Sequence, residues 1–442
     1  MHRHKNAWVV SVNMGYGHER AAFGLEDLAS GGIITANAYP GIPDTEREQW
    51  TQTRKIYETI SRLQPLPVIG PLAFGAMDTF QRIPDFYPRR DLSKPSYQLK
   101  EIYRQIRRGL GKHLVEKLSK RPLPFVSSFF IPAFAAEEYG YPGDIYIVTC
   151  DADISRAWAP LDPKKSRIKY FASNGRVVER LKLYGVRSEN IFLTGFPLPK
   201  KLIGGPEASI IKKDLAARIC NLDPNGIFIQ KYQKILHDEL GPALCKFKKK
   251  HSLTLTFSVG GAGAQKQIAF DALKGLSKAI KEKRITFNLE AGTRKELADE
   301  FKLAAKKLGL SSSLETQLHI HYYPDRSTYF RAFIQTLRTT DILWTKPSEL
   351  SFYTGIGMPI LMAPPIGSQE DFNKKWLETV GGGTPQLDPL LIGEWLFDWI
   401  NSGGLARFAW NGYIEAPTHG SYRIESVLTG EHMDLTELPL IV

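Results

Sequence analysis

A strand that runs into a glycine-rich loop and then into a helical pattern occurs twice in this sequence. The first copy contains SVNMGYG at 11–17, and the second contains SVGGAG at 258–263. Strand and helix patterns alternate after each copy, which is typical of a parallel, doubly wound sheet. A chain of 442 residues is also long for one domain. The sequence therefore predicts an α/β protein with two Rossmann-like domains that face a central cleft.

The domain boundaries follow from the places where this alternation fades. We expect a first domain at 1–200, with a mainly helical region at 44–121 that carries several prolines. Residues 201–250 end in the lysine-rich run KFKKKH and are predicted to be a linker or insertion. The second domain is predicted at 251–412. The remaining residues, 413–442, are expected to form a tail that packs back on the first domain.

The positive charge of the chain is concentrated in its first half. The net charge is +12, and residues 1–200 contribute 29 basic and 20 acidic residues to it. Residues 82–121 alone hold 12 basic and 4 acidic residues. Apolar residues at 97–118 follow helical spacing with Lys and Arg between them. This pattern fits either an ordinary amphipathic helix with a solvated basic face or a helix that lies on an anionic bilayer.

Several broad classes of protein are not supported by the sequence. The three cysteines, Cys150, Cys220 and Cys245, are too far apart to suggest a disulfide framework or a metal site. The longest mostly apolar stretches fall short of the roughly 20 residues that a spanning helix needs. The N-terminus runs directly into a strand pattern without a signal peptide. We therefore expect a cytoplasmic protein, and the basic first half makes the inner face of a membrane a candidate location.

The first glycine loop does not fit a dinucleotide-binding fingerprint. The third small residue of G-x-G-x-x-G is replaced by Arg20. The second strand offers only Asn37 where an acidic ribose ligand is expected. The loop instead places His18 at the start of a helix, directly after Gly15 and Gly17. Sequence alone therefore points away from NAD or FAD and toward a catalytic loop.

Five segments in the same order resemble the monogalactosyldiacylglycerol synthases. They resemble, more distantly, the N-acetylglucosaminyltransferases that make the lipid intermediate of peptidoglycan. The segments are MGYGHERAA (14–22), IYIVTCDAD with AWAP (145–160), RIKYFASNGRVVERLKLYGVRSENIFLTGFPL (167–198), SVGGAGA (258–264) and GMPILMAPPIGSQEDFN (357–373). The resemblance implies the GT-B fold, with the acceptor on the first domain and the nucleotide-sugar on the second.

The sequence departs from this family at two places. The family has a glutamate, similar to a ribose ligand, seven residues before the proline of its Gly-Leu-Pro motif. Here Phe352 stands seven residues before Pro359, and the nearest carboxylate is that of Glu349. We expect Glu349 to replace the family's ribose ligand. Residues 44–121, where an acceptor would be selected, have no counterpart.

His18 is the leading candidate for the catalytic base. A helix N-terminus disfavours the imidazolium, so the ring is expected to be neutral and able to take a proton from an acceptor hydroxyl. The alternative is that His18 only caps the helix or donates to a phosphate. Asp151 and Asp153 are rival bases, because they follow a strand that ends at the same edge. Their Asp-x-Asp spacing imitates a metal site but lies in the domain opposite the donor, so no metal is expected.

The donor is expected to bind at the second glycine loop and at two later strand ends. Backbone N–H groups in the loop would meet the diphosphate, although a tight turn explains the same glycines. The residues after the later strands would contact the ribose and the sugar, although helix capping explains them equally well. The predicted donor residues are Gly260, Gly261, Gly263, Glu349, Gln369, Glu370 and Asn373.

Taken together, these features predict an inverting glycosyltransferase. The expected donor is a nucleotide-diphosphate sugar, which the resemblance implies is UDP-linked, and the expected acceptor is a hydroxyl on a lipid or lipid-linked molecule. No cofactor and no nucleic-acid partner are expected. Two alternatives remain open: a sugar-nucleotide epimerase or hydrolase on the same fold, and a non-catalytic protein that binds a nucleotide-sugar or nucleic acid through its basic half.

Overall fold

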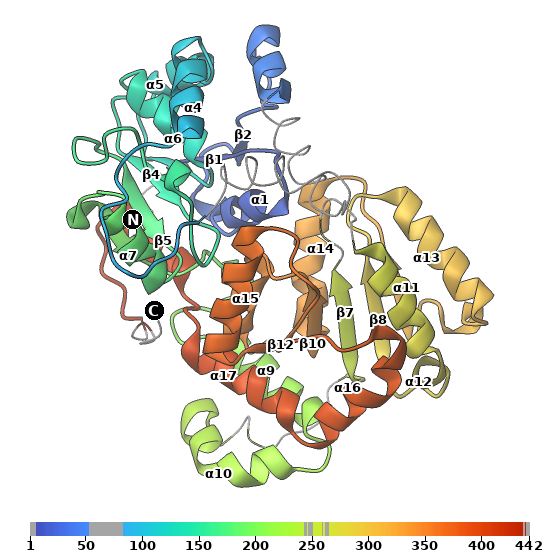
Figure 1. Cartoon of the computed structure of the whole chain (residues 1–442). Helices are drawn as coiled ribbons and strands as arrows, with labels where there is room; N and C mark the ends of the chain where they lie inside the picture. Colours follow the sequence, from blue (N-terminus) through green and yellow to red (C-terminus); the bar gives the residue numbers. More distant parts are fainter. Residues whose placement is uncertain are drawn as a thin grey trace.

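The computed structural model describes residues 6–52, 83–242, 245, 251–258, 260, 265–435 and 438 (Figure 1). Within them lie two parallel sheets of six strands each. Of the predicted acceptor region at 44–121, residues 53–82 lie outside the described residues. No helix in the described part of the chain has the length and apolar character required to cross a membrane.

The first sheet has the strand order β2-β1-β3-β4-β5-β6, and every neighbouring pair is parallel. Its strands are β1 (Trp8–Ser11), β2 (Ile34–Thr35), β3 (Phe125–Ser127), β4 (Ile145–Val148), β5 (Lys169–Ala172) and β6 (Ile191–Leu193). All four residues of β4, IYIV, are buried. A continuous apolar run of this kind is typical of a parallel strand that is covered on both faces.

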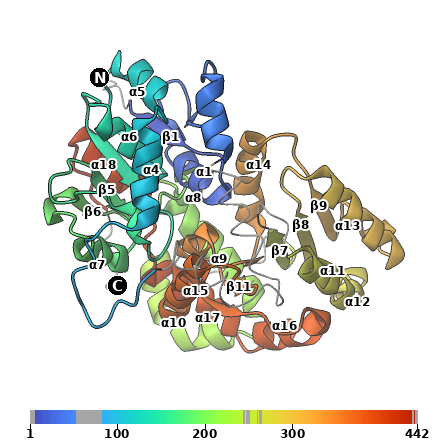
Figure 2. The ribbon, with the colours of Figure 1, turned by 45° about the horizontal axis from the view of Figure 1, so that its top comes forward.

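Helices cover the first sheet. They are α1 (Tyr16–Phe23), α4 (Tyr97–Arg107), α5 (Lys112–Ser119), α6 (Phe130–Glu138) and α7 (Gly175–Leu183). The helix α6 packs on β3 and β4, and α4 and α5 pack in turn on α6 (Figure 2). Seven of the nine residues of α6 are buried, because it lies between the sheet and these two outer helices.

The second sheet has the order β12-β11-β10-β7-β8-β9, again with parallel neighbours throughout. Its strands are β7 (Thr254–Ser258), β8 (Thr286–Glu290), β9 (Leu318–His321), β10 (Ile342–Thr345), β11 (Ile360–Met362) and β12 (Gly383–Pro385). Its helices are α11 (Lys266–Gly275), α12 (Ser277–Lys281), α13 (Lys295–Lys307), α14 (Arg326–Thr339), α15 (Ser368–Val380), α16 (Ile392–Asn401) and α17 (Gly404–Glu415).

Short 3₁₀ helices complete the two domains. They are η1 (Glu26–Leu28), η2 (Arg156–Trp158), η3 (Ser188–Asn190), η4 (Ser311–Ser313), η5 (Glu349–Ile356) and η6 (Pro389–Leu391). Every residue of η5 is buried, and this helix contacts both α15 and α1. Because α1 belongs to the first domain, η5 forms part of the contact between the two domains.

The chain between the two sheets is helical. It forms α8 (Lys200–Ile203), α9 (Ser209–Leu222) and α10 (Ile227–Leu240). Leucines of α9 and α10 belong to the same hydrophobic core as β7 and β8. The segment 209–240 is therefore packed into the second domain. Residues 243, 244 and 246–250, which include the lysine-rich run, lie outside the described residues.

The last described helix, α18 (Gly420–Thr429), lies against the first domain rather than the second (Figure 2). Its Ile424 belongs to the first domain's hydrophobic core. Glu425 forms an ion pair with Lys200, which also contacts Asp27 at 2.5 Å. The chain thus crosses between the domains twice, once after β6 and once after α17.

In each sheet, the chain first adds strands on one side of the first strand and then changes to the other side. In the first sheet the chain moves from β1 outward to β2 and then returns to place β3 on the other side of β1. In the second sheet β8 and β9 lie on one side of β7, and β10 lies on the other. Open α/β sheets bind ligands outside the carboxyl ends of the strands at such positions. The prediction of two doubly wound domains that face each other is confirmed, and the architecture is that of the GT-B fold.

Candidate active site between the two domains

The first glycine loop carries the chain from β1 into α1 at the reversal point of the first sheet. Gly15 is the N-cap of α1 and has φ +128°, a conformation that side chains with a Cβ atom rarely adopt. Two residues later, Gly17 allows the domains to approach, because a Cβ atom there would lie 3.2 Å from Glu349 Oε2. The loop therefore fixes His18 in the first turn of a helix that touches the opposite domain.

The imidazole of His18 is held in one orientation by its Nδ1 atom. Nδ1 lies 2.9 Å from the carbonyl oxygen of Ser128 and 3.1 Å from Cys150 Sγ. The ring also packs against the rings of Phe129 and Trp158, with centroids 4.7 and 6.0 Å away. A carbonyl oxygen only accepts hydrogen bonds, so in the neutral ring Nδ1 carries the proton and Nε2 keeps its lone pair.

The protein environment keeps His18 neutral. Burial lowers its pKa to about 4, although the Ser128 carbonyl and Glu349 partly oppose the shift. Cys150, next to it, has a pKa raised well above its ordinary value by burial, so its thiol stays protonated. At neutral pH the side chain of His18 is therefore an imidazole whose Nε2 atom keeps its lone pair and has no hydrogen-bond partner among the described residues, which is the form that a general base requires.

The two aspartates after β4 have different environments. Asp153 is fully buried, and Arg180 donates to both of its carboxylate oxygens, from Nε at 2.9 Å and from Nη2 at 2.8 Å. The backbone N–H of Ile154 donates to Asp153 as well, at 2.9 Å. A carboxylate with both oxygens occupied in a buried ion pair is poorly suited to accept a substrate proton. The geometry assigns Asp153 to packing, not to proton transfer.

Asp151, in contrast, lies among the donor-side residues. Asn373 Nδ2 donates to its Oδ1 at 3.0 Å. Burial raises the pKa of Asp151 to about 6, and Glu349 and Glu370 add to the rise, while Asn373 and Lys346 oppose it. Asp151, next in the chain to the Cys150 that contacts His18, is thus the group of the two whose pKa lies closer to neutral pH.

The Asp-x-Asp sequence does not bring its two carboxylates to one point. Asp153 is turned to Arg180, and Asp151 is turned to Asn373. Among the residues that the structure describes, no group of three or more His, Cys, Asp and Glu side chains is arranged to hold a metal ion.

A lysine that sequence reasoning missed lies at the end of β10, the strand beside the second glycine loop. Lys346 forms an ion pair with Glu370 of α15, whose other oxygen accepts from the backbone N–H of Ile366 at 2.8 Å. Burial would lower the pKa of Lys346, but Glu370, Glu349 and Asp151 outweigh it and raise the pKa. Only its position directly after a buried strand, in the run WTKPSE, signalled this residue.

Gly260 lies against this lysine, since a Cβ atom at Gly260 would be 2.9 Å from Lys346 Cε. Its carbonyl oxygen accepts from Arg294 Nη2 at 3.2 Å. The second glycine loop and the Lys346 ammonium group are therefore side by side. The other two predicted loop glycines, Gly261 and Gly263, lie outside the described residues.

The predicted sugar-binding residues of α15 have unequal exposure. Gln369, in the first turn, is partly exposed, whereas Asn373 is fully buried. Asn373 Oδ1 accepts from the backbone N–H of Ala152 at 2.7 Å, and its Nδ2 donates to Asp151 and, at 3.3 Å, to the carbonyl oxygen of Pro347. Asn373 therefore connects the two domains in this structure, and contact between either residue and a sugar stays a prediction.

Glu349, the predicted ribose ligand, also bridges the domains. Its Oε1 atom accepts from Arg20 Nη1 at 3.0 Å, and both side chains are almost completely buried. Phe352, which occupies the position of the family's glutamate, is buried and stacks on Phe196, with centroids 5.0 Å apart. A ribose contact in this part of the site must therefore come from a residue other than Phe352. In the sequence, Arg20 is conspicuous only as the residue in place of the third glycine, and its ion pair with Glu349 is visible only in the structure.

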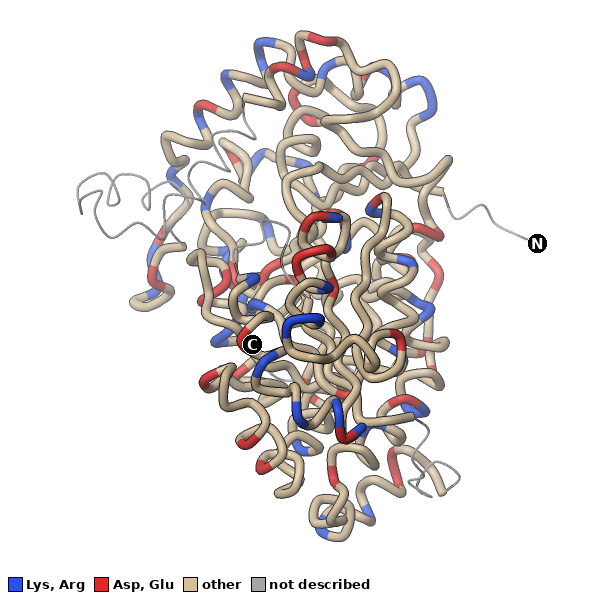
Figure 3. The backbone as a smooth tube through the Cα atoms, turned by 90° about the vertical axis from the view of Figure 1, so that its right-hand side faces the viewer, with Lys and Arg blue, Asp and Glu red and all other residues tan. Residues whose placement is uncertain are grey.

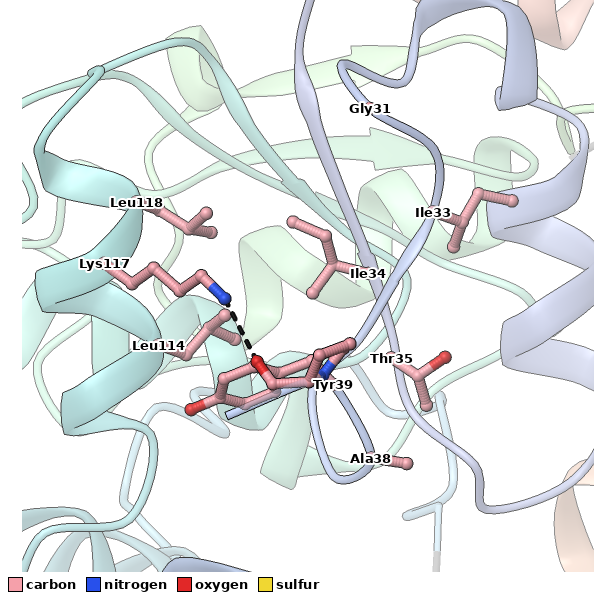
Figure 4. Close-up of a pocket in the computed structure, with 10 residues that line it drawn as sticks. Gly31, Ile33, Ile34, Thr35, Ala38, Tyr39, Leu114, Lys117 and Leu118 are labelled. Atoms are coloured by element: carbon pink, nitrogen blue, oxygen red, sulfur yellow. Dashed lines mark hydrogen bonds between the residues drawn. The ribbon is translucent and has the colours of Figure 1, made fainter. Parts of the chain in front are cut away.

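A separate cavity of about 250 Å³ lies in the first domain between β2 and α5 (Figure 4). Its lining is mainly apolar and consists of Gly31, Ile33, Ile34, Thr35, Ala38, Tyr39, Pro40, Leu114, Lys117 and Leu118. Lys117 Nζ donates to the carbonyl oxygen of Pro40 at 3.1 Å and lies 5.4 Å from the centroid of the Tyr39 ring. The cavity thus combines apolar walls with one cation.

The basic region at 82–121 forms two helices instead of one long amphipathic helix. The break falls at Gly109 and Gly111, which have φ +117° and +80°. Apolar residues of both helices, such as Leu99 of α4 and Leu114 of α5, are buried in the hydrophobic cluster that includes the first sheet. The apolar side of these helices is therefore packed against protein, which favours the ordinary amphipathic helix of the two alternatives.

Basic side chains of these helices remain exposed, among them Arg104 and Arg107. On the backbone as a whole, Lys and Arg are interspersed with Asp and Glu (Figure 3). Several of these charges have acidic partners. Arg107 Nε lies 2.7 Å from Glu138 Oε1, and Arg104 pairs with Glu101. This arrangement fits a solvated basic surface, and electrostatic attraction to an anionic membrane stays a prediction.

No protein-family model and no curated protein sequence matches this chain. Solved structures that resemble it include MurG from Acinetobacter baumannii, with a TM-score of 0.48, 12% identity, and coverage of 96% of this chain and 99% of the other. The UDP-GlcNAc 2-epimerase from Neisseria meningitidis bound to UDP-GlcNAc has a TM-score of 0.48, 14% identity, and coverage of 96% and 100%. S. aureus MnaA in its UDP co-structure has a TM-score of 0.47, 11% identity, and coverage of 98% and 99%.

The two doubly wound sheets define the class of this protein. It has a glycosyltransferase-like fold of the GT-B type, with polar residues from both domains gathered where the two reversal points meet.

Proposed function

We propose that this protein is an inverting glycosyltransferase that moves a sugar from a UDP-sugar to an acceptor hydroxyl. The observation that carries the proposal is the state of His18: a neutral imidazole whose Nδ1 is fixed by Ser128 and whose Nε2 is free. It lies in the first turn of a helix that contacts the second domain, within electrostatic reach of Glu349.

In the proposed reaction, His18 Nε2 takes the proton of the acceptor hydroxyl as its oxygen attacks the anomeric carbon. The bond from that carbon to the diphosphate oxygen breaks, and the diphosphate leaves with the bonding electron pair. Lys346, which is charged, and the loop that contains Gly260 stabilise the leaving group. A single displacement of this kind inverts the configuration at the anomeric carbon.

For the donor, we propose that Glu349 binds the ribose and that Gln369 and Glu370 contact the sugar. Asn373, which is hydrogen-bonded to Asp151, contacts the sugar as well. Support comes from their common position beyond β10 and β11, at the carboxyl edge of the second sheet. The proposed reaction uses no metal and no other cofactor.

For the acceptor, we propose a lipid or lipid-linked hydroxyl that is reached from the inner face of a membrane. The sequence resemblance to galactolipid synthases suggests this class. The apolar cavity beside β2, with Lys117 at its wall, supports it by offering the first domain a place for part of an alkyl chain (Figure 4). Nucleic acid is not expected to bind.

The test is product analysis with UDP-hexoses and lipid acceptors such as diacylglycerol. Formation of a glycolipid whose anomeric configuration, measured by NMR, is opposite to that of the donor is the expected result. The matched variant is Ile34→Trp, which fills the cavity and should raise the KM for the lipid while the affinity for UDP stays the same. Absence of any transferred sugar, with every UDP-sugar left intact, would contradict the proposal.

An epimerase or hydrolase is the second candidate, and one observation favours it. Asp151, whose pKa is raised to about 6, supplies a second proton-exchanging group near His18, and epimerisation needs an acid and a base. Incubation of UDP-sugars without any acceptor separates the two functions. Conversion to an epimer or to free sugar under these conditions would favour the second candidate.

A further inference from the structure

One arginine of the first domain is buried inside the second. Arg20, on α1, is 2% exposed, and its guanidinium carbon lies 4.8–5.5 Å from the ring centroids of Tyr16, Tyr329, Phe330 and Phe333. Three of these aromatic residues belong to α14. Besides Glu349, the guanidinium donates to the hydroxyl of Tyr329 from Nη2 at 2.8 Å. The helix that carries His18 is thus attached to the donor domain through this buried cation, and Glu19 of the same helix also pairs with Arg326 of α14.

A second carboxyl group lies close to this cation without contacting it. Glu290 is the last residue of β8 and is completely buried, and neither of its carboxylate oxygens has a hydrogen-bond partner among the described residues. In the sheet it is opposite Ser258 of β7. The hydroxyls of Ser258 and Tyr329 are 3.4 Å apart, and Tyr329 is the residue that binds Arg20.

The groups that face Glu290 leave it without a bonded cation. His321 of β9 lies 4.0 Å away, from Nε2 to Oε1, and burial lowers the pKa of His321 to about 4, so this ring is neutral. Tyr323 and Tyr329 act on the same carboxyl, and burial raises their pKa values too, so both are neutral. Arg20 is the cation whose charge acts on Glu290.

Glu290 is therefore protonated at neutral pH. Burial raises its pKa to about 8, and the attraction of Arg20 only partly offsets the rise. An ionised carboxylate in this position would be unpaired and costly to bury. It would become favourable only if a guanidinium group turned to it. Arg20 has two carboxyl groups within reach of its charge, and it is bonded to one of them.

We propose that Arg20 exchanges Glu349 for Glu290 when a nucleotide-sugar occupies Glu349. The inference rests on the proposed function, in which the donor ribose takes the carboxylate of Glu349. As the ribose hydroxyls displace the guanidinium, Arg20 turns within its aromatic surroundings to Glu290, and Glu290 releases its proton to the solvent. The α1 helix, with His18, then stays attached to the donor domain while the donor is bound. Arg20 and Glu290 are positioning residues in this process.

The first experiment measures proton release during donor binding. Calorimetric titration with UDP-galactose, whose phosphates carry no proton near neutral pH, is carried out at pH 7 in buffers of different ionisation enthalpy. About one proton should be released per donor bound, and the affinity should rise about tenfold from pH 6.5 to pH 7.5. Both effects should disappear in Glu290→Gln, which still binds the donor. The matched control Asp341→Asn should keep both, because Asp341 is another buried carboxyl with a raised pKa in the second domain and lies outside the proposed site.

The second experiment does not depend on a donor. Infrared spectra of protein labelled with ¹³C-glutamate report the carboxylic acid stretch of a protonated glutamate. At pH 7 the wild type should show this band, and Glu290→Gln should lack it. Glu349→Gln should also lack it, because Arg20 then has no other carboxylate to pair with. The double variant Arg20→Gln/Glu349→Gln should regain the band, because no cation remains to ionise Glu290.

The outcomes separate the exchange from the proposed function. If UDP-galactose does not bind but Glu349→Gln loses the band, the exchange of partners holds and the nature of the donor is wrong. If UDP-galactose binds to the wild type without proton release, and the band persists in Glu349→Gln, then Arg20 keeps a fixed partner and the inference is overturned.

Discussion

His18 follows β1 and Asp151 follows β4, with β3 between these two strands of the first sheet, and the two side chains hold protons with very different strength. Burial lowers the pKa of the imidazole to about 4 and raises that of the carboxyl to about 6. A general base works in its deprotonated form. The pH at which activity falls on the acid side therefore identifies which of the two groups takes the acceptor proton.

We predict that kcat stays constant from pH 8 down to about pH 5 and falls only near pH 4, where His18 becomes protonated. His18→Ala should lower turnover by at least ~10²-fold with donor affinity nearly unchanged. The measurement is a pH–rate profile of the wild type, His18→Ala and Asp151→Asn. An acid limb near pH 6 that disappears in Asp151→Asn would transfer the role of base to Asp151.

Asp153 differs from Asp151 in that its loss should affect folding. Removal of one partner from a buried ion pair leaves an uncompensated charge, so Asp153→Asn should lower the free energy of unfolding by about 3–5 kcal/mol. Urea denaturation is the measurement. Asp162→Asn is the matched control: its carboxyl pairs with Lys165 at 3.0 Å but is half exposed, and its loss should leave stability nearly unchanged. Equal stability of the two variants would show that the Arg180 pair contributes little.

At the scale of single elements, α4 and α5 illustrate a pattern that the sequence alone leaves ambiguous. Helical spacing of apolar residues predicts the helices, but the same stripe fits a bilayer and a protein core equally well. In the structure, α6 covers it. The basic residues that remain outside are those that an anionic surface can attract.

We therefore expect salt-sensitive binding to membranes. The protein should sediment with vesicles that contain anionic lipid and should be released at high ionic strength, where exposed charges are screened within about 3–10 Å. Neutral vesicles are the control. Binding to neutral and anionic vesicles to the same extent would show that charge is not responsible.

Gln369 and Asn373, one turn apart on α15, should differ in what their loss affects. Gln369→Ala should weaken a UDP-sugar by about 1–3 kcal/mol, the cost of an unpaired buried polar group, and leave UDP unchanged. Asn373→Ala should weaken the UDP-sugar as well and also lower the free energy of unfolding, because its amide binds Ala152 and Asp151 of the other domain. Glu349→Ala should weaken both ligands alike. Calorimetry with UDP and UDP-sugars tests all three variants, and loss of UDP affinity in Gln369→Ala would contradict the donor assignment.

At the scale of the whole molecule, the two-domain architecture could be predicted because strand and helix periodicity are local properties of the sequence. The loop that presents His18 was predictable for the same reason. The ion pair between Arg20 and Glu349 was not, since its partners are 329 residues apart and meet only when the domains do. The environments of the Asp151 and Asp153 carboxylates also could not be predicted, because they depend on partners that are distant in sequence, Asn373 and Arg180.

The return of α18 to the first domain should be important for the stability of the entire chain. A Cβ atom at Gly420 would lie 2.2 Å from the carbonyl oxygen of Phe196, so Gly420→Ala must displace backbone. We expect a loss of about 2–4 kcal/mol. Gly404→Ala is the control, since its Cβ atom would meet the Ser402 hydroxyl at 3.2 Å and a carbonyl oxygen at 3.4 Å. Thermal unfolding measures both, and similar melting temperatures would mean that α18 is only loosely attached.

The path of the chain also affects the order in which the protein can assemble during synthesis. The second domain is continuous from α9 to α17, so its core is complete as soon as α17 has left the ribosome. The first domain stays incomplete for longer, because its helix α18 begins at Gly420, 227 residues after Leu193, the last residue of its sheet. Until α18 arrives, the surface that it covers on the first domain is exposed, and domains generally fold as units during synthesis. The first domain to be translated is therefore the last to be completed.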